Sequence, residues 1–257
     1  MTQPSATPTP DSALPVQDGR SAMGWMHTAR FLTTAAQLHQ LPEIDVPEIA
    51  FVGLSNAGKS SCINTLTQQK QLAFASKKPG RTQHINLFSL GRQGITDAVL
   101  ADLPGYGYAA VSRSDKMRWQ QVMVNYLVSR PSLTGIVLLC DPRLGLTGLD
   151  EALLEVVRPR VEDGLKFLVL LTKADKLTRV EQAKALSIAR LQTGGGEVRM
   201  FSALKKQGVD EAALLLWHWA HPPVTDDGDE DGAADEADGT ELPDGNFNED
   251  DEPPSLD

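Results

Sequence analysis

The chain of 257 residues has 24 Lys and Arg against 34 Asp and Glu, a formal net charge of −10. This balance argues against a nucleic-acid partner, but residues 224–257 hold 15 acidic residues and no Lys or Arg, which leaves residues 1–223 with a net charge of +5. Two cysteines without metal-ligand spacing indicate a reduced, cytoplasmic protein, and the absence of a signal-peptide pattern or a long apolar run excludes membrane insertion.

Apolar runs alternate with helical patterns along the chain. Residues 23–39 predict a short amphipathic helix. Six strands are expected, at Ile49–Val52, Ile85–Leu90, Ala98–Ala101, Ile136–Cys140, Phe167–Leu171 and Val198–Phe201. Further helices are expected after the first strand through Asn64 and over Lys116–Val128, Leu149–Val161, Glu181–Leu191 and Val209–Trp219. This alternation predicts an α/β fold, with a mostly parallel six-stranded sheet covered by helices on both faces.

Composition divides the chain into four segments. Residues 1–22 are rich in Pro, Thr and Ser and predict disorder, and residues 23–46 form the short helix and a lead-in. Residues 47–223 carry the strand and helix patterns of one domain. Residues 224–257 form a low-complexity acidic tail, expected to be disordered because it has too little apolar surface to offset its ordering entropy.

The segment Gly53-Leu-Ser-Asn-Ala-Gly58-Lys59-Ser60 fits the phosphate-binding pattern G-x-x-x-x-G-K-[ST]. Its glycines let the backbone turn its N–H groups toward phosphates, Lys59 supplies a positive charge and the Ser60 hydroxyl is a ligand for Mg²⁺. A chance glycine-rich turn is the alternative. The strand predicted before the motif and the helix predicted after it favour a nucleotide-binding P-loop.

A second motif, Asp102-Leu-Pro-Gly105, ends a predicted strand. Alone, D-x-x-G is a common turn, but downstream of a P-loop its aspartate can hold Mg²⁺ through a water molecule. The Gly105 N–H can then reach the γ-phosphate.

A third motif, Thr172-Lys173-Ala174-Asp175, also follows a strand. A carboxylate at Asp175 can accept hydrogen bonds from guanine N1–H and N2–H₂, donors that adenine lacks at that edge, and Lys173 can lay its stem over the ring. A polar helix cap is the alternative for Asp175 alone. The weaker signal Phe201-Ser202-Ala203 places a small-residue turn where a backbone N–H can reach guanine O6.

These motifs together resemble the EngB (YihA/YsxC) group of bacterial P-loop GTPases, in the Era/EngA-like part of the translation-factor-related (TRAFAC) class. The resemblance runs from about Leu41 to Trp219 and includes KKPGRTQHIN, DLPGYGYA and LLTKADKL. It implies a Ras-like GTPase fold, with residues 47–223 as the G domain. Leu54 departs from the family, which usually has arginine there; its side chain is expected to point away from the phosphates.

The resemblance implies roles for further residues. Thr82 would ligate Mg²⁺ and sense the γ-phosphate, so the catalytic set is Lys59, Thr82 and Gly105 and the magnesium set is Ser60, Thr82 and Asp102. Asn56 matches an asparagine with which related GTPases hold K⁺, although asparagine also suits turns. The full nucleotide-binding set is Gly53, Leu54, Ser55, Asn56, Ala57, Gly58, Lys59, Ser60, Ser61, Gly80, Arg81, Thr82, Gln83, His84, Asp102, Leu103, Pro104, Gly105, Thr172, Lys173, Ala174, Asp175, Phe201, Ser202 and Ala203.

Slow intrinsic hydrolysis is expected, because Tyr106 stands where Ras-like enzymes place a glutamine that orients the attacking water. A P-loop ATPase or small-molecule kinase would share residues 53–60 but would have no use for the Thr172–Asp175 motif.

The basic stretch from Ile49 to Thr96 has six Lys and Arg and no acidic residue. It favours a face that docks on RNA through shape and phosphate contacts, with solubility and attraction for the nucleotide as the alternative. The resemblance implies a switch in assembly of the large (50S) ribosomal subunit, with rRNA and ribosomal proteins as partners, needed for normal cell division and septation. The sequence does not give the oligomeric state, and a monomer is the default expectation. Direct action on septum proteins is the alternative, and no DNA partner is expected.

Overall fold

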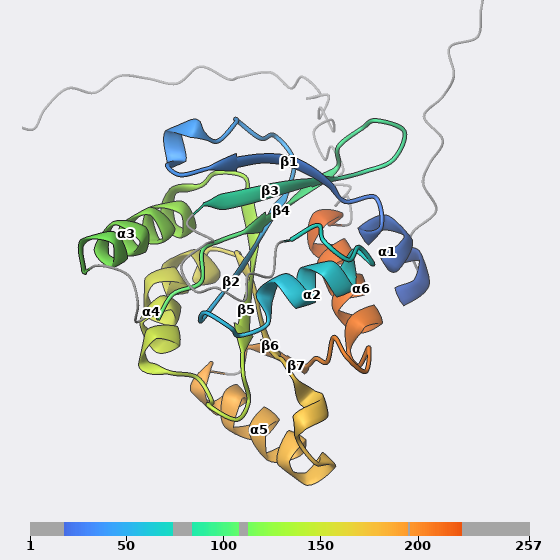
Figure 1. Cartoon of the computed structure of the whole chain (residues 1–257), viewed down its shortest axis with the longest axis vertical. Helices are drawn as coiled ribbons and strands as arrows, with labels where there is room; N and C mark the ends of the chain where they lie inside the picture. The colour runs from blue at the N-terminus through green and yellow to red at the C-terminus, as the bar shows by residue number, and fades with distance from the viewer. Residues whose placement is uncertain (1–17, 74–83, 108–112, 195, 223–257) are drawn as a thin grey trace, which may run out of the picture. The chain divides into compact units, whose positions relative to one another are not determined.

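The computed structural model describes residues 18–73, 84–107, 113–194 and 196–222. In this part of the chain, seven strands form one sheet in the order β1-β3-β4-β2-β5-β6-β7 (Figure 1). The strands are β1 (Arg30–Ala35), β2 (Glu48–Gly53), β3 (Ile85–Leu90), β4 (Ala98–Asp102), β5 (Leu133–Cys140), β6 (Lys166–Leu171) and β7 (Glu197–Met200). The β1–β3 and β3–β4 pairs are antiparallel, and the others are parallel.

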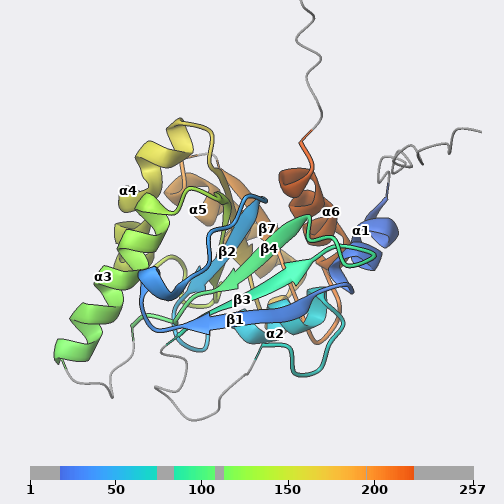
Figure 2. The same cartoon turned by 90° about the horizontal axis from the view of Figure 1, so that it is seen from above.

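Helices cover both faces of the sheet, as Figure 2 shows. One face carries α3 (Arg113–Ser129), α4 (Gly148–Glu162) and α5 (Arg179–Gln192), and the other carries α1 (Gly19–Met26), α2 (Lys59–Leu66) and α6 (Val209–Ala220). Every residue of β2 is buried, because this central strand has neighbours on both edges and helices on both faces. Within the described ranges, no helix combines the length and the apolar character needed to cross a membrane.

The predicted elements after residue 47 are confirmed in type and order, and the α/β class is confirmed. The helix expected over residues 23–39 is wrong: α1 ends at Met26 and the chain then forms β1, which adds a seventh strand to the expected six. Helix α1 begins at Gly19, inside the segment expected to be disordered. Most of β1 is exposed, and its pairing with β3 makes it a strand.

A buried carboxylate holds the end of α3 to the start of β2. Glu48 is fully buried and accepts hydrogen bonds from the Tyr126 hydroxyl, from the Arg130 guanidinium at 3.0 Å and from the Ser132 hydroxyl at 3.2 Å. Arg160 of α4 donates to the Leu127 carbonyl at 2.9 Å. These contacts fix the carboxyl-terminal end of α3 against the sheet.

A second polar cluster joins α1 to the end of α6. Asp97 accepts from Trp25 Nε1 at 2.8 Å and lies 3.5 Å from His221 Nε2, and the His221 ring stacks on Trp217 at 4.5 Å. Partial burial disfavours the charged imidazolium, but the Asp97 carboxylate and the Trp217 carbonyl outweigh it and raise the pKa of His221.

Candidate functional site

The sequence motifs gather at the carboxyl edge of the parallel strands. The P-loop follows β2, Asp102 ends β4, Thr172 follows β6 and Phe201 follows β7. Strand β2 lies between β4 and β5, so the chain leaves β2 where the strand order reverses. Crevices outside the carboxyl ends of strands at such a switch point are where open α/β sheets bind ligands.

The start of α2 is open to an anion. Gly58 occupies the N-cap with φ +100°, a left-handed conformation that suits glycine, and no side chain caps the helix. Helices α4 and α5 instead have the N-cap residues Thr147 and Thr178, each in a capping box with an acidic residue. The first turn of α2 has no acidic residue and begins at Lys59, so the positive end of the helix dipole lies at the site.

Lys59 and Asp102 form a buried ion pair. Lys59 Nζ lies 2.5 Å from Asp102 Oδ1, and the two side chains are 8% and 1% exposed. The predicted phosphate ligand and the predicted magnesium-associated carboxylate are therefore adjacent. A buried charge without a partner is costly, so each side chain offsets the cost of burying the other.

The loop after β4 packs directly on the P-loop. Ser55 N donates to the Tyr106 carbonyl at 2.8 Å, and Tyr106 N donates to the Gly53 carbonyl at 3.3 Å. A Cβ on Gly105 would come within 3.1 Å of Ser55 Cα, so only glycine allows this approach without displacement. The Asp102–Gly105 segment is thus part of the same site as the P-loop.

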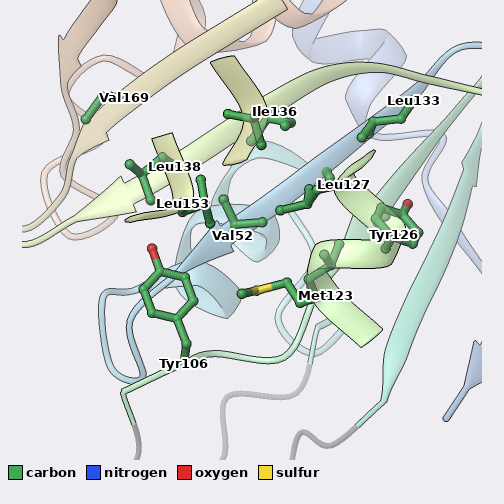
Figure 3. Close-up of a cluster of buried hydrophobic side chains, with 14 of the residues drawn as sticks. Val52, Tyr106, Met123, Tyr126, Leu127, Leu133, Ile136, Leu138, Leu153 and Val169 are labelled. Carbon is green, nitrogen blue, oxygen red and sulfur yellow. The ribbon is translucent and has the colours of Figure 1, made fainter. Parts of the chain in front are cut away.

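The Tyr106 side chain points into the protein interior. Its ring lies among apolar side chains that include Val52, Met123 and Leu153 (Figure 3), and its hydroxyl donates to Asp150 Oδ1 at 2.5 Å. Burial and the Asp150 carboxylate both raise the pKa of this phenol, so it remains a proton donor.

At the other end of the site, Lys173 ties two elements together. Its Nζ donates to the Asn56 carbonyl in the P-loop at 2.9 Å and to Asp141 Oδ2 at 3.0 Å. The neighbouring Thr172 hydroxyl is buried and donates to the Ala57 carbonyl at 2.6 Å. Thr172 therefore supports the P-loop from inside the protein.

Asp175 is held by the last strand–helix connection. Ser202 Oγ donates to Asp175 Oδ1 at 2.6 Å, and Lys205 N donates to Ser202 Oγ at 3.1 Å. Ala174 N donates to the Phe201 carbonyl at 3.1 Å, which joins the two motifs through the backbone. The Ser202 hydrogen bond lowers the pKa of Asp175, so this side chain is an anionic acceptor at neutral pH.

Other predicted residues have less direct placements. Gly80, Arg81, Thr82 and Gln83 lie outside the described residues, and His84 is exposed just before β3. Leu54 and Leu149 both pack beside Gly107, where a Cβ on the glycine would lie 2.5 Å from Leu54 Cδ2. The Leu54 side chain is therefore directed into protein contacts.

Two acidic residues at this edge were absent from the prediction. Asp141 directly follows β5 and pairs with Lys173, and Asp150 is the buried partner of Tyr106 near the start of α4. The signal available for Asp141 was a carboxylate directly after a buried strand, at the edge where parallel strands end.

The comparisons with known proteins agree with this geometry. A family model described as "50S ribosome-binding GTPase" matches residues 48–173. The probable GTP-binding protein EngB of Acidovorax ebreus is 86% identical over 205 residues, which cover 80% of this chain and 94% of that protein. The corresponding protein of Albidiferax ferrireducens is 79% identical over 201 residues, or 78% of this chain and 97% of that protein.

Among solved structures, the crystal structure of a probable GTP-binding protein engB aligns with a TM-score of 0.54 at 18% identity, covering 67% of this chain and 98% of that one. This likeness confirms the Ras-like P-loop GTPase fold. Together with the high identity to its curated relatives, it shows that the chain belongs to the EngB family of GTP-binding proteins and carries a GTPase domain.

Proposed function

We propose that the protein is a slow, magnesium-dependent GTPase that acts as a nucleotide-gated switch in assembly of the large ribosomal subunit. The observation that carries the nucleotide assignment is the uncapped start of α2 beside the Lys59–Asp102 pair, on the same sheet edge as the anionic Asp175. In this proposal, Lys59 would bind the phosphates at one end of the site and Asp175 would bind the base at the other. We propose residues 47–223 as the G domain, to which the lead-in of residues 23–46 contributes β1.

At the phosphate end, Lys59 and the backbone of Gly53–Gly58 would hold the β- and γ-phosphates, and Gly105 N would donate to the γ-phosphate. The Ser60 hydroxyl and the Asp102 carboxylate are hard oxygen donors that fit Mg²⁺, with Asp102 acting through water and Thr82 as a further ligand. The ion would neutralise charge on the phosphates. Lys59 would turn from Asp102 to the phosphates when nucleotide binds.

At the base end, Asp175 would accept from guanine N1–H and N2–H₂, and the Lys173 stem would cover one face of the ring. The Ala203 backbone N–H would reach guanine O6. Comparison of nucleotides on the unmodified protein tests this arrangement. Inosine triphosphate lacks the N2 amine and is expected to bind about tenfold more weakly than GTP, and ATP more weakly still. Equal affinity for GTP and ATP would contradict guanine recognition.

Slow turnover follows from the Tyr106–Asp150 contact, because a buried, hydrogen-bonded phenol cannot orient water at the γ-phosphate. A partner or a cation would complete the site. Asn56, with φ +66°, is the proposed ligand for K⁺. Turnover in KCl and NaCl tests the cation: a faster rate in KCl supports it, and equal rates refute it.

The proposed partner is the 50S subunit, contacted as a monomer in the cytoplasm through rRNA phosphates and ribosomal proteins. Support comes from the description of the matched family model and from the basic stretch between Ile49 and Thr96, which has six Lys and Arg and no acidic residue. Loss of function would then impair growth, division and septation. Direct binding to septum proteins is the alternative.

Sedimentation of cell extract with GDP or a non-hydrolysable GTP analogue tests the partner. The protein is expected in the 50S fraction with one nucleotide state and outside it with the other, with binding that weakens steeply as salt rises. Absence from that fraction with both nucleotides would favour the septum alternative.

A further inference from the structure

Asp141 is a carboxylate that the proposed nucleotide contacts do not use. It directly follows β5 and is only 6% exposed. Its Oδ1 accepts from Arg143 N at 3.1 Å and from Arg143 Nε at 2.9 Å, and its Oδ2 accepts from an Arg143 terminal nitrogen at 2.6 Å and from Lys173 Nζ at 3.0 Å. Four donors from two residues therefore hold this carboxylate.

The two partners approach Asp141 differently. The Arg143 guanidinium engages both carboxylate oxygens, which fixes the plane of the carboxylate and leaves Oδ2 directed at Lys173. The Arg143 hydrogen bonds outweigh partial burial and hold the pKa of Asp141 well below its usual range. Because Arg143 is 48% exposed, it forms the outer side of this cluster, and Lys173 lies toward the P-loop.

Lys173 needs a second anchor to keep its stem in one place. A lysine side chain has about 2 kcal/mol of rotamer entropy to lose when it is fixed. Its ammonium is held by the Asn56 carbonyl on the P-loop and by Asp141 beyond β5, so the stem stretches between two separate elements. With Asp141 removed, one carbonyl would remain, and a side chain already 35% exposed could turn toward water.

We propose that Asp141 is a positioning residue for guanine binding, which holds the Lys173 stem in place as the surface on which the base lies. This inference rests on the proposed function, because Lys173 and Asp175 must be the base-binding residues. It assigns to the end of β5 a part in base recognition, in addition to the motif after β6. Arg143 contributes through Asp141 by orienting the carboxylate.

The test measures the dissociation constant for GDP in the full chain and in Asp141→Asn. This variant keeps the shape of the side chain but loses its charge, and it is expected to bind GDP about tenfold more weakly. The KM for GTP should rise by a similar factor, with kcat changed less than twofold. Competition by inorganic pyrophosphate, which occupies the phosphate end alone, should be unchanged. Unchanged GDP affinity, or equal weakening for pyrophosphate, would overturn the proposal.

A matched control and a double variant separate positioning from general loss of structure. Asp97→Asn removes another partly buried, hydrogen-bonded aspartate, at the α1–α6 cluster, and should lower the melting temperature without changing GDP affinity. Lys173→Met keeps an apolar stem and removes the ammonium. If Asp141 acts through Lys173, the double variant should bind GDP no more weakly than whichever single variant, Asp141→Asn or Lys173→Met, binds GDP less tightly. Additive losses would assign Asp141 a role independent of Lys173.

Arg143→Ala serves if Asp141→Asn does not fold, with an expected loss of about threefold in GDP affinity; no loss would count against the proposal. Failure of guanine binding and failure of the Asp141 role give different results. If the unmodified protein does not prefer GDP to ADP, guanine binding itself is wrong. If it does and the variants match it, only the role of Asp141 is wrong.

Discussion

At the proposed phosphate end of the site, two candidate functional side chains form an ion pair with each other, Lys59 with Asp102. At the base end, Lys173 and Asp175 are bonded to supporting residues, Asp141 and Ser202, that leave their binding surfaces in place. In the proposed function, Lys59 would exchange Asp102 for the phosphates when nucleotide binds, whereas Lys173 and Asp175 would keep their partners. An end that rearranges suits sensing whether a phosphate is bound, and an end that stays fixed suits recognition of which base is bound.

The largest expected effect comes from breaking the phosphate end with Lys59→Met. Nucleotide affinity should fall at least about 100-fold, and unfolding of the nucleotide-free protein should become easier by about 3 kcal/mol, because Asp102 is left buried and unpaired. Isothermal calorimetry and urea unfolding measure the two effects. The double variant Lys59→Met with Asp102→Asn should recover stability but not affinity; if stability does not recover, the ion pair does not explain the loss.

The next largest effect is expected from a substitution at the proposed base end that changes which nucleotide is preferred. Asp175→Asn should weaken GTP binding about 100-fold while improving xanthosine triphosphate, whose carbonyl at position 2 can accept from the new amide. Melting of the free protein should change little, because asparagine can still accept from Ser202. Competition assays with both nucleotides check the exchange, and GTP affinity equal to that of the unmodified protein would rule out Asp175 as the base reader.

Tyr106→Phe tests whether the buried hydroxyl beside the proposed phosphate end acts in folding or in hydrolysis. The variant removes one hydrogen bond to the buried Asp150, which keeps the Thr147 N–H and hydroxyl at 2.8 Å, so stability should fall by about 1 kcal/mol. Single-turnover hydrolysis should be unchanged, because the phenol faces the core. A rate change of tenfold or more would make Tyr106 a participant in the reaction.

The smallest effect lies away from both ends, at His221 and Asp97. Because the pKa of His221 is raised above 6.5, its contribution to stability is complete below that pH and is lost as pH rises through the folded value. The pKa of Asp97 is lowered, because hydrogen bonds from His221 and Trp25 outweigh partial burial, so its contribution is lost as pH falls below about 3.8. The urea midpoint of unfolding should decline slightly between pH 5.5 and 8.5, and His221→Gln should remove that decline. GDP affinity should depend neither on the decline nor on the substitution. A decline that persists in the variant would assign it to another group.

The sequence was informative where structure depends on residues close together in the chain. The β2 strand, buried on both faces, appears as a continuous apolar run, and the P-loop motif places a glycine and a lysine at the start of the next helix. Strand β1 was missed because most of it is exposed and it owes its conformation to β3, more than fifty residues later.

The sequence also missed the two acidic residues because their contacts join positions far apart in the chain. Asp141 and Lys173 are 32 positions apart, and Tyr106 and Asp150 are 44 positions apart. Neither spacing repeats a local period, so these contacts arise only when parallel strands bring their carboxyl ends to one edge. The motifs yield a hypothesis about which residues face the nucleotide, and the topology was needed to show which residues hold those side chains.

The Glu48 anchor has a mechanical consequence for the segment that links the Asp102–Gly105 motif to the rest of the domain. Because Tyr126 and Arg130 attach the last turns of α3 to the first residue of β2, that end of the helix is a pivot. A helix attached at one end can rotate about that end but cannot shift along its own axis. If γ-phosphate displaces the start of α3 as the proposed function implies, the helix would therefore rotate about this anchor, with a lateral shift that grows with distance from Glu48 and is greatest where the helix begins at Arg113.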